Sequence, residues 1–143
     1  MIVADILASK GHDVVTARPD SILAHIANIM VERGIGAIIV TDAARKVLGI
    51  VSERDIVRAI AKGGAAALGD VVHSHMTAHV TLAFPAMTVT QAMELMTHGR
   101  FRHLPVVVDG TLAGLVSIGD IVKHRLAEIE GESRAMRDYI GSA

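Results

Sequence analysis

The chain has 143 residues, of which 51% are hydrophobic and only 2% aromatic, and its formal net charge is -1. This length suits one ordinary domain or two small interlocked ones, with a core of aliphatic side chains and methionines. The balanced charge argues against broad electrostatic binding to nucleic acid or anionic membranes, and the lack of cysteine excludes disulfides, thiolate nucleophiles and zinc–thiolate sites.

The first half of the chain predicts alternating strands and helices. Apolar residues recur at helical spacing over residues 22–30, and two glycines, Gly34 and Gly36, follow them. In chain order, we predict an extended segment at 14–16, a helix from 21 to 33, strands at 37–40 and 47–51 around a turn at 42–46, a helix at 55–62 and a linker at 62–70.

The second half predicts the same order of elements. Thr88 and Gln91 form a capping-box pattern at the start of a helix, and Asp109-Gly110 is typical of a hairpin turn. In chain order, we predict an extended segment at 79–81, a helix after residue 88, strands at 103–108 and 112–116, a helix at 120–130, and a separate amphipathic helix at 131–143 with Met136, Tyr139 and Ile140 on its apolar side.

A nine-residue motif is written twice in the chain. It reads GIVSERDIV at 49–57 and GLVSIGDIV at 114–122, with six of nine positions identical. Such a repeat indicates a duplicated supersecondary unit, here β-α-β-β-α. We therefore predict an α/β (α+β) fold in which two repeats pack sheet to sheet with pseudo-two-fold symmetry. The expected parts are repeat one at 1–64, repeat two at 65–130 and a helical tail at 131–143.

Each copy of the motif places a Ser-x-x-Asp pair between a strand and a helix. This pair has two interpretations. Ser at a helix N-terminus with a carboxylate three residues later is a capping box. The junction of a strand with a helix N-terminus is also where anions and ribose-bearing ligands are held. A cap and a ligand site are compatible, because one hydroxyl or carboxylate can serve both.

The duplicated unit, its G-h-h-S-x-x-D signature (h, apolar) and the strand Arg102-His103-Leu104-Pro105-Val106 resemble a tandem cystathionine-β-synthase (CBS) domain pair, or Bateman module. The resemblance covers about residues 1–126, and the chain is similar to small stand-alone bacterial CBS pairs. It implies an adenosine ligand such as AMP, ATP, NAD(H) or an S-adenosyl compound, a sensor function and a homodimer. No metal is expected.

The resemblance also implies site residues. Asp55 and Asp120 would accept hydrogen bonds from the ribose hydroxyls, and Ser52 and Ser117 would face phosphate or ribose. Each site would draw on both repeats. Asp55 would face Phe101, Arg102, His103 and Leu104, and Asp120 would face Ile35, Gly36 and Ala37. The expected ligand-binding set is completed by Ser52, Ser117, Arg54, Pro105, Thr16 and Thr81.

The two expected sites differ in charge. Arg54, Arg102 and His103 would surround a phosphate at the Asp55 site, and an arginine fork suits that role because it is always charged. At the Asp120 site, Gly119 stands in place of Arg54 and Ala37 in place of His103. The Asp55 site should therefore favour the more phosphorylated ligand.

The sequence leaves three other functions open: metal binding, catalysis and nucleic-acid binding. His73, His75 and His79 form a loop cluster that could bind zinc or nickel, but solvent-exposed histidines are the commoner case. A small nucleotide-processing enzyme using Asp55 or Asp120 as base, and a nucleic-acid-binding adaptor, are the alternatives. A symmetric repeat of the polar pair favours binding over one asymmetric catalytic centre. We expect a non-enzymatic regulatory module with an unknown protein partner.

No secretory signal or membrane span is expected. Asp5 lies near the N-terminus, and no basic segment precedes an apolar stretch there. The most apolar stretch, 35–51, is interrupted by charged residues and falls short of the roughly 20 apolar residues of a span. The expected location is the cytoplasm.

Overall fold

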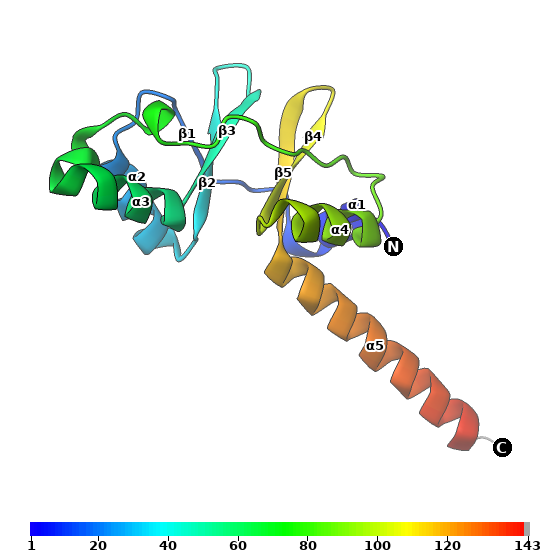
Figure 1. The fold of residues 1–143 in the computed structure, drawn as a ribbon. Helices are drawn as coiled ribbons and strands as arrows, with labels where there is room; N and C mark the ends of the chain where they lie inside the picture. The colour runs from blue at the N-terminus through cyan, green and yellow to red at the C-terminus, as the bar shows by residue number, and fades with distance from the viewer. Residues whose placement is uncertain (142–143) are drawn as a thin grey trace.

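The computed structural model describes residues 1–141 and consists of two halves, each with a small β-sheet and covering helices (Figure 1). The first half contains α1 (Val3–Lys10), β1 (Thr16–Ala17), α2 (Leu23–Arg33), β2 (Ala37–Thr41), β3 (Val47–Ser52), α3 (Glu53–Gly63) and the 3-10 helix η1 (Gly64–Gly69). The second half contains the 3-10 helix η2 (Val72–Ser74), α4 (Val89–Gly99), β4 (His103–Val108), β5 (Thr111–Ser117) and α5 (Ile118–Gly141). The predicted α+β class is confirmed.

The sheets repeat the predicted pairing with one difference. In the first half, β1 pairs parallel to β2 and β2 antiparallel to β3, whereas the second sheet contains only β4 and β5. No strand forms at 79–81, and the counterpart of β1 is a single parallel bridge between Ala83 and Val106. Pro85 has no N–H to donate, so the ladder does not extend beyond this bridge.

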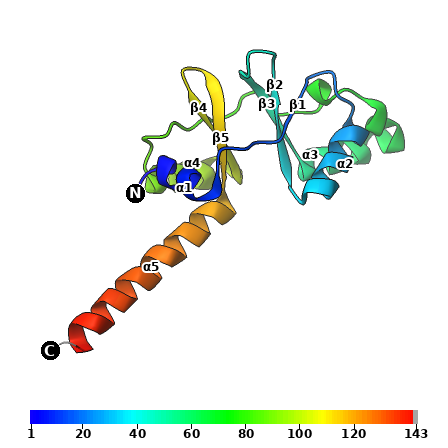
Figure 2. The same cartoon turned by 180° about the vertical axis from the view of Figure 1, so that it is seen from behind.

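The N-terminal helix packs against the second half of the chain (Figure 2). Its residues Val3, Ile6 and Leu7 belong to the same buried cluster as Leu104, Val116 and Ile121. The other core cluster joins α2, α3 and the first sheet, with Leu23, Ile26, Ile38 and Val51 fully buried. The residues before β1 therefore complete the core of the second half, a crossing that local sequence patterns did not indicate.

A glycine of the duplicated motif makes this crossing possible. A Cβ built on Gly114 would lie 2.8 Å from a methyl carbon of Leu7, and one built on Gly49 would lie 2.7 Å from the Thr77 carbonyl oxygen. In each half, a chain segment thus crosses the last strand at a position that only glycine leaves open. The identity of Gly49 and Gly114 in the repeat has this packing cause.

One predicted boundary was wrong, and the predicted linker has a short helix of its own. The expected linker at 62–70 is mostly the 3-10 helix η1, which is anchored by the buried side chain of Ala67. The expected break before 131–143 does not occur, because α5 runs without interruption from Ile118 to Gly141. One interior glycine costs a helix only about 1 kcal/mol, and no proline follows Gly131. Residues 142 and 143 of the predicted tail lie outside the described residues.

Local signals at the other ends were confirmed. The Thr88 hydroxyl accepts from the Gln91 N–H at 3.0 Å, and the Gln91 side chain accepts from the Thr88 N–H at 3.0 Å. Asp109 and Gly110 have φ angles of 51° and 78°, as a primed hairpin turn requires. None of the described helices combines the length and the apolar character needed to cross a membrane.

Candidate ligand-binding site

The Ser52–Asp55 pair lies where β3 passes into α3, and it caps that helix. The Ser52 N–H donates to Asp55 Oδ2 at 2.8 Å, and the Asp55 N–H donates to Ser52 Oγ at 3.4 Å. Oδ2 therefore serves the cap, while Oδ1 lies 3.5 Å from Nη1 of Arg58. The Asp55 side chain is only 11% exposed. The capping interpretation is confirmed, and Oδ1 keeps its capacity to accept further hydrogen bonds.

A cavity of about 810 Å³ opens beside this pair. Its walls come from both halves of the chain and from the segment that connects them. They include Ser52, Arg54 and Asp55 from the first half, Thr77, His79, Val80 and Thr81 from the connecting segment, and Arg100, Phe101, Arg102 and His103 from the second half. The predicted neighbours of Asp55 in the Arg102–His103 region are thus brought to it.

Cations dominate the charged wall of the cavity. Arg54 and Arg102 were predicted there, and the structure adds Arg58 and Arg100. Arg58 lies one helical turn after Asp55, and Arg100 ends α4 in a left-handed conformation with φ 55°. Helical spacing in α3 could have identified Arg58 as a neighbour of Asp55, but no local sequence signal predicts that Arg100 lies at the cavity. Four arginines and two carboxylates, Glu53 and Asp55, thus line the cavity, and this excess of positive charge suits an anionic ligand.

The apolar wall differs from the prediction in its members. Ile50, Val57, Val80 and Phe101 line the cavity. Leu104 is fully buried in the core of the second half, and Pro105 is also buried. Neither Leu104 nor Pro105 lines the cavity, and its apolar lining is supplied by Phe101, Val57, Val80 and Ile50.

His103 lies between the two Ser-x-x-Asp pairs. It lines the Asp55 cavity and pairs with Ser117 across β4 and β5. Burial lowers the pKa of His103, and the positive charges of Lys10 and Arg102 lower this pKa further, against the weaker opposite effect of Asp120 and Glu53. At neutral pH, His103 is therefore a neutral imidazole that a bound anion would help to protonate.

The second pair, Ser117 and Asp120, caps α5 in the same way but has an additional partner. The Ser117 N–H donates to Asp120 Oδ2 at 2.8 Å. Lys10, at the end of α1, donates to the same oxygen at 2.7 Å and to the Leu115 carbonyl at 2.8 Å. Burial opposes ionisation of Asp120, but the hydrogen bonds from Lys10 and Ser117 hold its pKa below the ordinary value. No sequence signal linked Lys10 to a carboxylate so far along the chain.

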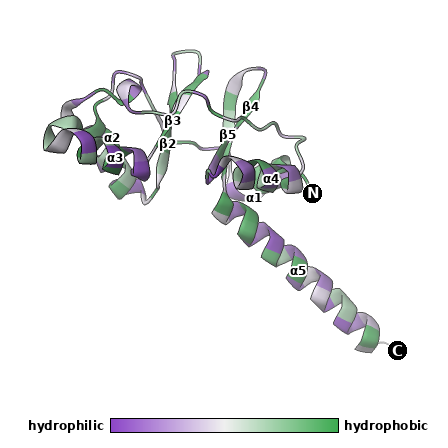
Figure 3. Ribbon diagram, in the orientation of Figure 1, coloured by the Kyte–Doolittle hydropathy of each residue, from purple (hydrophilic) through white to green (hydrophobic). Residues whose placement is uncertain are grey.

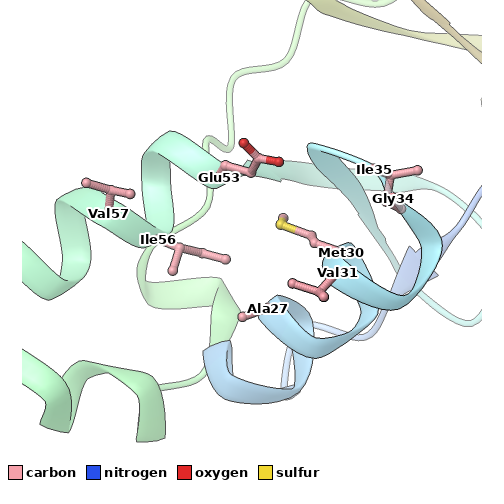
Figure 4. A pocket seen from close by; sticks show the side chains of 8 residues that line it. All are labelled: Ala27, Met30, Val31, Gly34, Ile35, Glu53, Ile56 and Val57. Carbon is pink, nitrogen blue, oxygen red and sulfur yellow. The ribbon is translucent and has the colours of Figure 1, made fainter.

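The other residues expected around Asp120 lie in different places. Gly36 lines the Asp55 cavity, and Ala37 is buried in β2. Thr16, which was expected in the ligand-binding set without assignment to either site, pairs with Ile39 in the first sheet. Ile35 lines a separate cavity of about 520 Å³ between α2 and α3. Figure 4 shows its apolar side chains, with Glu53 at one edge. Asp120 is not among the residues lining either cavity.

The histidine cluster does not form a metal centre within residues 1–141. His75 Nε2 lies 2.8 Å from Asp70 Oδ2, and His79 faces the Asp55 cavity. In this described part of the chain, no three His, Cys, Asp or Glu side chains are grouped closely enough to hold a metal ion.

Known proteins resemble this chain over most of its length. The sequence profile of the CBS domain matches residues 3–62 and again residues 68–127. A mitochondrial CBS domain-containing protein of Arabidopsis thaliana, CBSX3, is 31% identical over 96% of this chain and 71% of its own length.

Solved structures agree with this match. A CBS-domain containing protein from Agrobacterium tumefaciens superposes with a TM-score of 0.84 at 49% identity, covering 87% of this chain and 99% of that one. CBSX2, solved in complex with AMP, superposes with a TM-score of 0.71 at 25% identity, covering 80% of this chain and 88% of that one. Together with the duplicated motif, these matches show that the chain belongs to the CBS-domain family and consists of a tandem CBS pair.

Proposed function

We propose that this CBS pair is a regulatory module that binds an adenosine nucleotide, such as AMP, ATP or NAD(H), in the cavity beside Asp55. The observation that carries the proposal is the composition of that cavity. A nearly buried carboxylate, four arginines and an apolar wall with Phe101 converge on about 810 Å³, a volume typical of small-molecule sites. The relative solved with AMP supports an adenosine ligand.

Each part of the cavity suits one part of such a ligand. Asp55 Oδ1 would accept from the ribose hydroxyls, and Arg54, Arg58 and Arg102 would bind phosphate with charge-assisted hydrogen bonds. The Phe101 ring and the neighbouring aliphatic side chains would hold adenine. Thr81 and Ser52 offer hydroxyls at the polar end.

The regulatory step follows from the position of the cavity. Because its walls come from both halves, a bound ligand would add contacts between the two halves. A ligand shifts an equilibrium between two arrangements of the halves only through different affinities for the two arrangements. We propose that a homodimer partner or another protein responds to this change. Val31 and Val57, 84% and 65% exposed beside the α2–α3 cavity, support a homodimer contact on that face.

A thermal-shift screen tests the ligand class. Ligand-free protein would be heated with AMP, ADP, ATP, NAD or NADH, with guanosine and cytidine nucleotides as controls. At about 100 times the dissociation constant, a ligand adds about 2.7 kcal/mol to the free energy of unfolding, which raises the melting temperature by roughly 5–15 °C. If no adenosine compound raises it more than the controls do, the proposed function is wrong.

A further inference from the structure

The C-terminal part of α5 extends beyond the rest of the molecule. Figures 1 and 2 show the helix leaving the body at β5 and projecting away from both sheets. Ile121 is its only fully buried residue among 118–141, and every residue from Ile129 to Gly141 is exposed. A free stretch of about this length is marginal as an isolated helix in water, and Gly131 weakens it further.

The exposed part carries an apolar stripe with a heptad spacing. Figure 3 shows hydrophobic and hydrophilic residues alternating along α5. The stripe, here called the α5 seam, consists of Val122, Leu126, Ile129, Ser133, Met136 and Ile140. At about 100° per residue, these six positions fall within an arc of roughly 80° on one side of the helix. Its five apolar members are 51% to 66% exposed.

The seam alternates in steps of four and three residues, which is the a/d pattern of a coiled coil. Leu126, Ser133 and Ile140 occupy a positions, and Val122, Ile129 and Met136 occupy d positions. His124, on the opposite side, contacts Met1 of the body, so the seam faces away from the chain's own core. A helix with this stripe needs an apolar partner of matching length.

The charges beside the seam specify which partner fits. In a parallel pair of identical helices, each g residue lies near the e residue of the next heptad on the partner helix. Arg125 at g would meet Glu130 at e, and Glu132 at g would meet Arg137 at e. Both contacts join opposite charges. In an antiparallel pair centred on the seam, Glu130 would meet Glu130 and Lys123 would meet Arg137, which repel.

The charged side chains keep enough freedom for these contacts. Glu130 lies 3.9 Å from Arg134 and is 69% exposed, so its carboxylate is not occupied by a close ion pair. Arg125 bonds Glu128 at 2.8 Å along its own helix but is 54% exposed and has a second terminal nitrogen to offer. Because the folded body already nucleates α5, a second helix would not have to supply the cost of the first turn.

We infer that α5 binds the α5 of a second copy of this chain as a parallel, in-register two-stranded coiled coil over residues 122–140. This deepens the homodimer part of the proposed function by assigning the contact and its direction. The nucleotide part does not depend on it.

Cysteine cross-linking of the full chain tests the geometry, because the protein has no cysteine of its own. In a parallel pair, the d position 136 meets its own copy. Met136→Cys should therefore form an intermolecular disulfide under mild oxidation several-fold faster than Asp138→Cys, the matched control on the opposite face. Equal rates would overturn the inference. In a second experiment, the Leu126→Cys protein is mixed with the Met136→Cys protein. Faster cross-linking between positions 126 and 136 than between two copies of position 136 would also overturn the inference, because it indicates antiparallel helices.

A charge exchange tests the partner contacts separately. Glu132→Arg places like charges at both symmetric contacts and should raise the dimer dissociation constant about tenfold. Adding Arg137→Glu should restore it, whereas Asp138→Arg, with the same change in net charge away from the seam, should leave it unchanged. Sedimentation measures all three. If Glu132→Arg leaves the dimer dissociation constant unchanged, the coiled coil is wrong but the homodimer stands. If the protein is a monomer at every concentration, both are wrong. The rise in melting temperature with nucleotide is measured separately for each protein, so the nucleotide part of the proposed function is tested independently.

Discussion

Asp55 and Asp120 each use one carboxylate oxygen in a helix cap. In both, Oδ2 accepts the N–H of the capping serine at 2.8 Å. The sequence already indicates that a cap and a ligand site are compatible, and the geometry agrees, because the cap uses Oδ2 and not Oδ1. The two aspartates differ in their surroundings: Asp55 faces a cavity, whereas Asp120 is bonded to Lys10.

Lys10 should make the Asp120 site selective for phosphorylated ligands. A ribose that bonds Asp120 would share this carboxylate with the Lys10 ammonium, and a ligand with its own anion would interact with this cation more favourably. In an Asp55→Ala background, Lys10→Met should tighten adenosine binding and weaken ATP binding, so that the ATP preference falls about tenfold. Calorimetric titration measures both affinities.

The control for this prediction is Lys62→Met, which removes a lysine from the far end of α3. It should leave the ratio of the two affinities unchanged. An unaltered ratio in the Lys10→Met protein would show that Lys10 has no part in ligand choice.

His103 should make stability depend on pH. Its pKa in the folded protein lies below the ordinary value of 6.5, because of burial and then of Lys10 and Arg102, with Asp120 and Glu53 opposing. The unfolded chain therefore binds more protons as the pH falls through this value, so the free energy of unfolding decreases there. The stability that His103 contributes is present above about pH 6.5 and is lost below it.

Urea denaturation at several pH values measures this effect. The wild type should lose more stability than His103→Gln between about pH 7.5 and pH 5.5, since the glutamine does not titrate. Parallel curves for the two proteins would show that the titration of His103 is not linked to folding.

Among the elements, the strand that enters each motif depends on a glycine. Gly49 in β3 lets Met76 and Thr77 cross over it, and Thr77 exchanges hydrogen bonds with Ile50 at 2.9 and 3.0 Å. Thr77 also lines the Asp55 cavity. This glycine therefore connects the strand, the crossing segment and the candidate site.

Gly49→Ala should destabilise the protein by about 1–3 kcal/mol, because the new methyl would overlap backbone that cannot move freely. It should also weaken nucleotide binding by displacing Thr77. Gly69→Ala is the matched control, since nothing lies within 4 Å of a Cβ there and its φ is not positive. Chemical denaturation compares the two, and equal stability would contradict the crowding seen at Gly49.

Local signals predicted most elements because their causes are local. The β4 strand, the Asp109-Gly110 turn and the Thr88 cap depend on alternation, turn preference and capping chemistry within a few residues. The break expected at Gly131 was wrong for a different reason. Glycine weakens a helix without necessarily ending it, and α5 continues through Gly131.

At the scale of the whole molecule, the candidate site belongs to neither half alone. The resemblance to CBS pairs predicts that Asp55 lies near Arg102 and His103, and all three line the cavity. Composition and periodicity alone could not predict this proximity, because these contacts join distant parts of the chain. Three further features depend on the same long-range geometry: the Lys10–Asp120 bond, the docking of α1 on the second half, and the position of Arg100 at the cavity. Neither the local sequence patterns nor the family resemblance predicted them.

Calorimetric titration of ligand-free protein with AMP, ATP and NAD measures the proposed function most directly, in the wild type and in the Asp55→Ala/Asp120→Ala variant. The wild type should bind at least one of these nucleotides, and the variant should bind it at least tenfold more weakly, a loss of about 1.4 kcal/mol. If the aspartates served only as helix caps, the variant would lose about 1 kcal/mol of stability per cap and keep its affinity. Near-native affinity in the variant, or no binding by the wild type, would contradict nucleotide recognition by the Ser-x-x-Asp pairs.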